Sequence, residues 1–261
     1  MTKLPALFIS HGSPMLAIDD SPARRFLVEL GRTLPRPKAI VVASAHWETS
    51  GRLAVSLAAH PETIHDFGGF PQALFEIQYP APGAPEIAAR AAALLEHAGF
   101  GVEQSATRGL DHGAWVPLHL MYPEADIPTA QVSLRRGGSP AEHERIGKAL
   151  AQLREDGVLI VGSGSLTHNL YEFRGGPIDA PVPSWVSEFD GWMHSRLRDK
   201  QRESLLDYRA QAPFAARNHP TEEHLLPLFV AMGAAGETAN AERLHASYEY
   251  GVLAMDMYAF L

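Results

Sequence analysis

The chain has 261 residues, of which 46% are hydrophobic, and its formal net charge is −8. This composition is typical of a globular protein with a sizeable core, and it argues against nucleic-acid binding, because no basic stripe could neutralise phosphates. The lack of cysteine excludes disulfides, thiolate metal ligands and a cysteine nucleophile. No stretch is long and apolar enough for a signal peptide or a membrane span, so we expect a cytoplasmic protein without a membrane partner.

Short apolar runs alternate with helical patterns along the chain. The runs predict buried strands at 7–10, 39–45, 53–57, 131–134 and 158–162. Capping residues and helical periodicity predict helices at 22–33, 84–99, 140–155, 184–200 and from 221 onward. This alternation favours an α/β fold: a single domain over residues 1–261, with a mainly parallel central sheet flanked by helices.

Three histidines come after an apolar strand and a few small residues. They are His11 in "FISHGSP", His46 in "VVASAHW" and His168 in "VGSGSLTH". In open α/β sheets, ligands bind at the carboxyl ends of the strands, so three parallel strands would bring these side chains to one crevice. We expect the small residues Gly162 to Ser165 to leave room beside His168 for a ligand.

Two further histidines fit the same crevice. Thr221 is a plausible N-cap, which would place His224 in the first turn of a helix, where the helix dipole favours a neutral imidazole. His112, in "GLDHGAWVPL", lies in a glycine-flanked turn before a predicted helix. Without cysteine, the ligands must be nitrogen and oxygen atoms, which suits zinc or non-haem iron. The sequence therefore predicts a site for one divalent metal ion.

Other chemistries lack their motifs. The chain contains no G-x-S-x-G elbow, no G-x-x-x-x-G-K-[ST] loop and no H-E-x-x-H helix. The segment 58–83 is long and rich in proline, and loops of that length inside a domain tend to be functional.

Six ordered blocks carry a resemblance that runs from residue 6 to the C-terminal end. They are "FISHGSPM", "VVASAHWET", "TIHDFGGFP", "GLDHGAWVPL", "GSGSLTHNL" and "NHPTEEHLLPL". In this order they resemble the class III extradiol ring-cleaving dioxygenases, and within them the subgroup similar to the 4,5-DOPA dioxygenases.

The resemblance implies a role for each of the five histidines. The family's first two metal ligands fall on His11 and His46, and the third ligand of this subgroup falls on His224. The catalytic histidine that transfers protons matches His168, which is also a candidate fourth ligand. A second active-site histidine, which contacts the substrate or oxygen, matches His112.

The implied reaction is the extradiol cleavage of a catechol, DOPA-like or a related small one, by O2. We expect the side chain of the substrate to contact His65, Asp66 and Phe67, with Tyr79 as a further candidate. Better-studied class III enzymes complete the site with a glutamate, whereas here His224 takes that place, beside Glu222 and Glu223.

The sequence does not determine which metal ion is bound. Fe(II) would support dioxygenase activity, and Zn(II) could be the bound form. A zinc-dependent hydrolase or amidase on the same fold is the alternative function, and a binding or structural protein with a vestigial site is the third. For the oligomeric state, a homo-oligomer is one of the alternatives.

Overall fold

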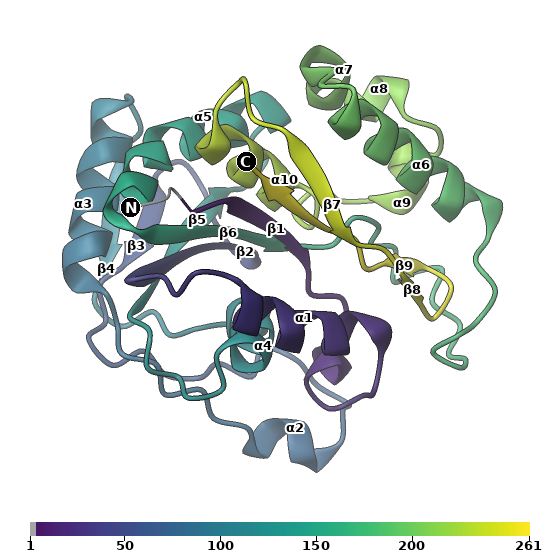
Figure 1. The fold of residues 1–261 in the computed structure, drawn as a ribbon, viewed down its shortest axis with the longest axis horizontal. Coiled ribbons are helices and arrows are strands. Elements are labelled where there is room, and N and C mark those ends of the chain that lie inside the picture. The colour runs from purple at the N-terminus through teal and green to yellow at the C-terminus, as the bar shows by residue number, and fades with distance from the viewer. Residues whose placement is uncertain (1–3) are drawn as a thin grey trace.

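The computed structural model describes residues 4–261, and an eight-stranded sheet runs through its centre (Figure 1). The strand order is β4-β3-β5-β2-β6-β1-β10-β7. The bounds are β1 (Ala6–Ser10), β2 (Ala39–Thr49), β3 (Leu53–Ser56), β4 (Val102–Ser105), β5 (Thr129–Arg135), β6 (Val158–Gly164), β7 (Ala241–His245) and β10 (Met257–Phe260). Two short strands, β8 (Tyr248–Glu249) and β9 (Leu253–Ala254), form a separate ribbon.

The four central strands, β5, β2, β6 and β1, are all parallel. The strands beyond them include antiparallel pairs: β10 with β1 and with β7, and β3 with β5. The predicted α/β fold with a mainly parallel central sheet is therefore confirmed. All five predicted strands are present, and the central ones are buried on both faces, as their continuous apolar runs indicate.

Helices cover both faces of this sheet (Figure 1). The face that carries Val41 and Ile160 packs against α3 (Pro85–His97), α5 (Pro140–Leu150) and α10 (Leu226–Ala235). The opposite face, with Val42 and Val161, packs against α1 (Pro22–Thr33) and α4 (His112–Met121). The remaining helices are η1 (Pro14–Ala17), α2 (Gln72–Glu76), η2 (Ala151–Asp156), α6 (Ser184–Arg198), α7 (Arg202–Leu206), α8 (Tyr208–Gln211) and α9 (Ala215–Asn218). None of the helices in the described part is long and apolar enough to cross a membrane.

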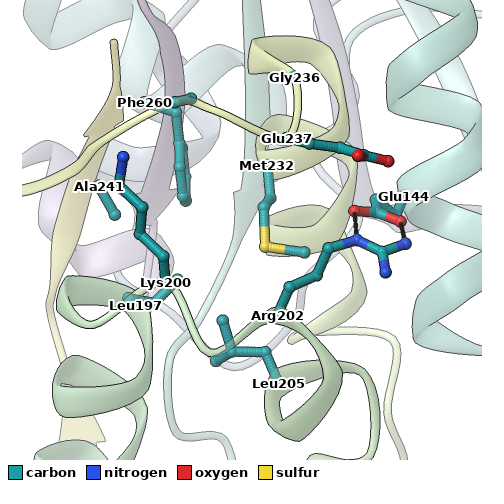
Figure 2. A pocket seen from close by; sticks show the side chains of 11 residues that line it. Glu144, Leu197, Lys200, Arg202, Leu205, Met232, Gly236, Glu237, Ala241 and Phe260 are labelled. Atoms are coloured by element: carbon teal, nitrogen blue, oxygen red, sulfur yellow. Dashed lines mark hydrogen bonds and ion pairs between the residues drawn. The ribbon is translucent and has the colours of Figure 1, made fainter.

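A small cavity of about 40 Å³ lies where α6 and α7 meet α5 and α10, and Figure 2 shows the side chains that line it. Arg202 donates from two guanidinium nitrogens to the buried carboxylate of Glu144, which joins α7 to α5. Lys148 donates to Glu237 at 2.8 Å and continues this network. The cavity contains none of the predicted site residues, and its ion pairs join α7 and Glu237 to the helix α5.

Candidate active site

Five histidines from distant parts of the chain lie together at the carboxyl edge of the sheet. His11 directly follows β1, His46 lies within β2, and His112 is the first residue of α4. His168 lies in the loop after β6, and His224 lies in the turn before α10. These are the five histidines that the sequence predicted to meet.

An irregularity in β2 places His46. The pairing of β2 with β5 shifts register between Ala43 and Glu48, and His46 lies in that stretch. Such bulges bend a strand and redirect its side chains, and they are frequent beside active sites. The side chain of His46 lies against His11, at the end of β1, and His224, in the turn before α10.

The start of α4 is fixed by a buried N-cap residue, Asp111. Its carboxylate accepts hydrogen bonds from the Ala114 amide at 3.2 Å and from the Ser44 hydroxyl at 2.6 Å. Arg108 donates to the second carboxylate oxygen at 2.6 Å. Because a cap determines where the first helical turn begins, Asp111 places His112 beside β2.

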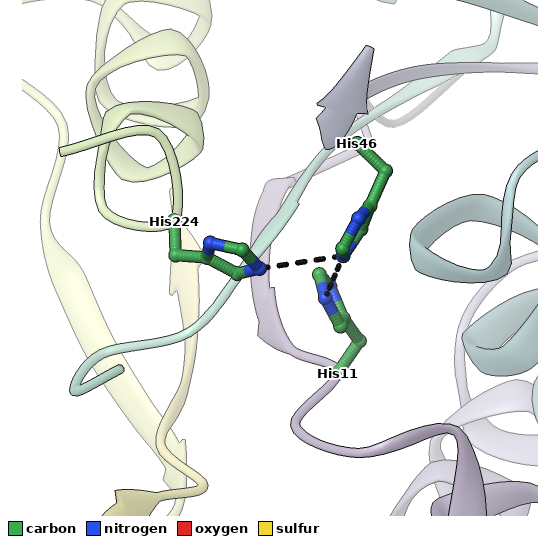
Figure 3. Close-up of side chains that lie close together, drawn as sticks. All are labelled: His11, His46 and His224. Atoms are coloured by element: carbon green, nitrogen blue, oxygen red, sulfur yellow. Dashed lines mark hydrogen bonds between the residues drawn. The ribbon is translucent and has the colours of Figure 1, made fainter. Parts of the chain in front are cut away.

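Three imidazole nitrogens converge between these elements (Figure 3). The Nε2 atom of His46 lies 3.1 Å from Nε2 of His11 and 3.3 Å from Nε2 of His224. All three ligand atoms lie within 4.8 Å of one another. One cation could therefore contact all three nitrogens.

The hydrogen bonds on the other side of the rings determine what these nitrogens can do. The Ser163 hydroxyl donates its only hydrogen to the Gly113 carbonyl, so it must accept from Nδ1 of His11, at 3.0 Å. Nδ1 of His224 lies 3.0 Å from a carboxylate oxygen of Glu223, which can only accept. In both rings the hydrogen is on Nδ1, and Nε2 carries a free lone pair directed at the other rings.

Burial keeps these three imidazoles neutral. It is the main reason that the pKa values of His11 and His224 lie well below the ordinary value, and neighbouring histidines lower them further. Burial and the nearby His112 lower the pKa of His46 to about 3. Neutral imidazole is the form that binds metals. Three converging lone pairs on neutral rings fit one divalent cation that accepts nitrogen ligands.

Asp66 connects two of the histidines. One carboxylate oxygen accepts from the backbone amide of His112 at 2.9 Å and lies 3.0 Å from its Nδ1. The other oxygen lies 3.4 Å from Nδ1 of His46. Partial burial alone would raise the pKa of Asp66, but its hydrogen bonds with His112 outweigh burial and lower the pKa to about 2. Asp66 is therefore an anion between two imidazoles.

His168 lies beside the three converging histidines. Its ring stacks on that of His224, with the centroids 3.5 Å apart and the planes 6° from parallel. Its backbone amide donates to the Asn218 carbonyl at 3.0 Å, which ties the loop after β6 to the end of α9. Burial lowers the pKa of His168 to about 4.

A cavity of about 340 Å³ opens beside the histidines. Four of the five histidines line it, all except His11. Its wall is otherwise mainly apolar and includes two aromatic rings; these residues are Pro14, Phe67, Phe70, Leu170 and Leu253. Such a site, apolar with a few converging polar groups, suits a small aromatic ligand.

Two of the predicted substrate contacts line this cavity, and two do not. Asp66 and Phe67 are in its wall. Nε2 of His65 instead donates to the Ile77 carbonyl at 3.0 Å, so this ring joins two segments of the loop 58–83. Tyr79 is completely buried in the core beneath α1 and α4. His65 and Tyr79 therefore do not line this cavity, and a proline-rich loop offers no periodicity from which their orientation could be predicted.

Comparison with known proteins relates this site to a family. A family model described as the catalytic LigB subunit of aromatic ring-opening dioxygenase matches residues 5–260. The chain belongs to the LigB family. A 4,5-DOPA dioxygenase extradiol of Beta vulgaris is 46% identical over 257 residues, 97% of this chain and 95% of that protein. One of Escherichia coli K12 is 42% identical over 236 residues, 89% of this chain and 86% of the other.

A solved structure of the same shape supports this membership. The crystal structure of an uncharacterized protein from Escherichia coli K12 matches with a TM-score of 0.80 and 34% identity, over 98% of this chain and 99% of the other. The predicted enzyme class, an extradiol aromatic ring-opening dioxygenase, is confirmed by the family and its relatives. These findings do not favour the zinc hydrolase.

Within this LigB-family site, the small residues of β6 have a different task from the predicted one. A Cβ atom on Gly162 would lie 2.0 Å from the Pro227 carbonyl oxygen, and one on Gly164 would lie 2.1 Å from that of His224. The Ser165 amide also donates to the His224 carbonyl, at 2.8 Å. The glycines therefore let the backbone around His224 approach the strand. They do not provide room for a ligand beside His168, as the sequence had suggested.

The helix after this approach begins later than predicted. Its N-cap is Leu225, without a side-chain hydrogen bond, and α10 starts at Leu226. The prediction that Thr221 caps the helix and places His224 in its first turn was therefore wrong. The Thr221 hydroxyl instead donates to Glu223 at 3.0 Å, and burial rather than a helix dipole is the main cause of the low pKa of His224.

Sequence analysis missed several residues of the LigB-family site. Ser163 is small, which is all that the pattern of β6 predicts for it, but a serine at a strand end is also a natural hydrogen-bond partner for a neighbouring histidine. Phe70 lies in the same "DFGGFP" block as Phe67, which was a usable signal. Leu170 and Leu253 had none, because only the folded chain brings them to the cavity.

Proposed function

We propose that this enzyme binds one divalent metal ion through His11, His46 and His224 and cleaves a small catechol beside it with O2. The observation that carries the proposal is the convergence of three Nε2 lone pairs next to a cavity with an aromatic wall. Relatives named 4,5-DOPA dioxygenase extradiol make a DOPA-like catechol the proposed substrate.

Fe(II) is the metal that we propose for activity. When bound, it would supply Lewis acidity and the redox chemistry that O2 requires, whereas Zn(II) could occupy the same nitrogens without redox chemistry. Three neutral imidazoles would leave a 2+ charge uncompensated. The carboxylates of Asp66 and Glu223 lie beside the outer nitrogens of His46 and His224, and they would balance this charge without contacting the metal.

The protons of the reaction are assigned to the two remaining histidines. His168 and His112 both line the cavity, and neither belongs to the group of three converging nitrogens. We assign the transfer of protons from and to the catechol to His168, and contact with the substrate or O2 to His112. His168 as a fourth ligand is the alternative, since its ring lies against that of His224.

The aromatic wall would hold the substrate ring. Phe67 and Phe70 lie edge to face, with centroids 5.5 Å apart, and both line the cavity. A catechol packed against such rings gains about 0.5–1.5 kcal/mol beyond the burial of its area. Homo-oligomer formation and a cytoplasmic location stay predictions.

Anaerobic reconstitution with Fe(II), followed by addition of catechols and ¹⁸O2, tests the proposal. We expect a yellow ring-opened product whose mass contains two ¹⁸O atoms. His46→Ala should abolish both iron retention and product. His97→Ala, at an exposed position on α3, is the matched control and should retain iron and form product as the wild type does. Iron-loaded protein that opens none of the catechols would contradict the proposal.

A further inference from the structure

We propose that Asp66 is a positioning residue that sets the tautomers of His46 and His112, a role that rests on the proposed metal site and extends it. Its carboxylate lies between Nδ1 of His112, at 3.0 Å, and Nδ1 of His46, at 3.4 Å. The sequence suggested only that Asp66 contacts the substrate.

The contact with His112 defines the first tautomer. The backbone amide of His112 always donates, and it bonds to Oδ1 of Asp66 at 2.9 Å. That oxygen is thereby held as an acceptor, so Nδ1 of the same residue must carry its hydrogen in order to bond there as well. Nε2 of His112 is left with a lone pair, which makes it a hydrogen-bond acceptor in the cavity wall.

The contact with His46 defines the second tautomer. The anionic Oδ2 of Asp66 lies 3.4 Å from Nδ1 of His46, where it attracts an N–H and repels a lone pair, so we assign the hydrogen of His46 to Nδ1 as well. Nε2 of His46 then directs its lone pair toward Nε2 of His11 and Nε2 of His224. One carboxylate thus prepares a metal ligand and a cavity-lining histidine at the same time.

The backbone around Asp66 is held before any ligand arrives. The amide of Ile64 donates to the Leu110 carbonyl at 2.8 Å, and the Trp115 indole donates to the Ile64 carbonyl at 3.0 Å. Both bonds tie the segment just before Asp66 to α4 or to the residues directly preceding it. Because these hydrogen bonds join the backbone before Asp66 to α4, the carboxylate and His112 keep their relative position.

A rival role for Asp66 is that of a metal ligand. Its carboxylate, His46 and His112 also form a group whose ligand atoms lie within 4.8 Å of one another. However, Oδ1 already accepts the backbone amide of His112, and the Nε2 atom of His46 faces the other group. These contacts favour the positioning role, and the experiment separates the two.

The test compares Asp66→Asn with Asp66→Ala. In the Asn variant, the amide oxygen should stay with the two donors of His112, so the NH2 group faces Nδ1 of His46. That NH2 group donates, which forces the hydrogen of His46 onto Nε2 and removes the lone pair from the metal site. The Ala variant frees both rings without forcing either tautomer.

Two measurements read this out. Long-range ¹H–¹⁵N spectra of metal-free protein should show wild-type His46 and His112 with hydrogen on Nδ1, and His46 with hydrogen on Nε2 only in Asp66→Asn. Calorimetric titration with Zn(II) should show a loss of affinity of about 10- to 100-fold for Asp66→Asn and a smaller loss for Asp66→Ala. Asp179→Asn, at an exposed position, is the control and should bind as wild type does.

The outcomes distinguish this inference from the proposed function. Wild-type spectra with hydrogen on Nε2 of either histidine would overturn the tautomer assignment, even if the variants fail to fold. A larger loss of affinity for Asp66→Ala than for Asp66→Asn would point to a directly coordinating or merely structural carboxylate. If wild type takes up no metal, the proposed metal site fails, while the spectra still decide the role of Asp66.

Discussion

Replacing Gly164 with alanine should weaken both the fold and the metal site. The new Cβ atom would lie 2.1 Å from the His224 carbonyl oxygen, whereas an ordinary contact begins at 3.4 Å. The turn before α10 must therefore retreat by roughly 1.3 Å, and such overpacking typically costs about 1–3 kcal/mol. The bond from the Ser165 amide to His224, at 2.8 Å, should lengthen or break.

The same displacement moves a ligand atom out of reach. Metal–ligand distances tolerate only about 0.2 Å, so a shift of the His224 backbone should lower metal affinity at least about 10-fold. Gly191→Ala is the matched control, because nothing lies within 4 Å of a Cβ at that exposed position in α6. There the same substitution should stabilise the protein by about 0.5–1 kcal/mol.

Urea unfolding followed by circular dichroism gives the free energy of unfolding of the metal-free proteins, and Zn(II) titration gives the affinity. Gly162→Ala, whose Cβ would meet the Pro227 carbonyl instead, should lose comparable stability with a smaller effect on affinity. A Gly164→Ala protein that matches wild type in both quantities would refute the reasoning about close approach.

Three further outcomes follow from the site. His11→Ala should lose its metal, which elemental analysis would show beside the His97→Ala control; full occupancy would remove His11 from the ligands. His168→Ala should keep iron and catechol binding but lose at least about 100-fold in turnover, as expected for a general acid–base group, whereas loss of iron would make His168 a ligand. Ser163→Ala removes the acceptor of His11 Nδ1 and should weaken Zn(II) binding about 10- to 100-fold by calorimetry; an unchanged affinity would show that this hydrogen bond does not set the ring.

The sequence predicted the parts of this protein that local patterns define. Apolar runs located the central strands, and their ends located His11, His46 and His168 near one crevice. The strand β4 was missed, because only one of its four residues is fully buried and no run or alternation marks it. β10 is a continuous buried run, but it was not separated from the C-terminal block that carried the resemblance.

Contacts between distant segments were beyond the reach of local patterns. The role of Gly164 depends on the turn at His224, which lies far along the chain. The sequence shows that position 164 has no side chain, but it does not show which segment packs there. Asp66 presented the same difficulty. Its position in a functional loop was predictable, whereas its two histidine partners come from β2 and the start of α4.

The position of β1 in the sheet has a consequence for synthesis on the ribosome. This strand is made before the other described strands, yet both of its neighbours, β6 and β10, come from the second half of the chain. About 150 residues must follow before β6 exists, which takes roughly 8–30 s at ordinary translation rates. During that time the wholly apolar segment "ALFI" has no partner strand. Nascent chains that stop before Gly164 should therefore aggregate or bind chaperones rather than fold, because both β1 and β2 would present open edges.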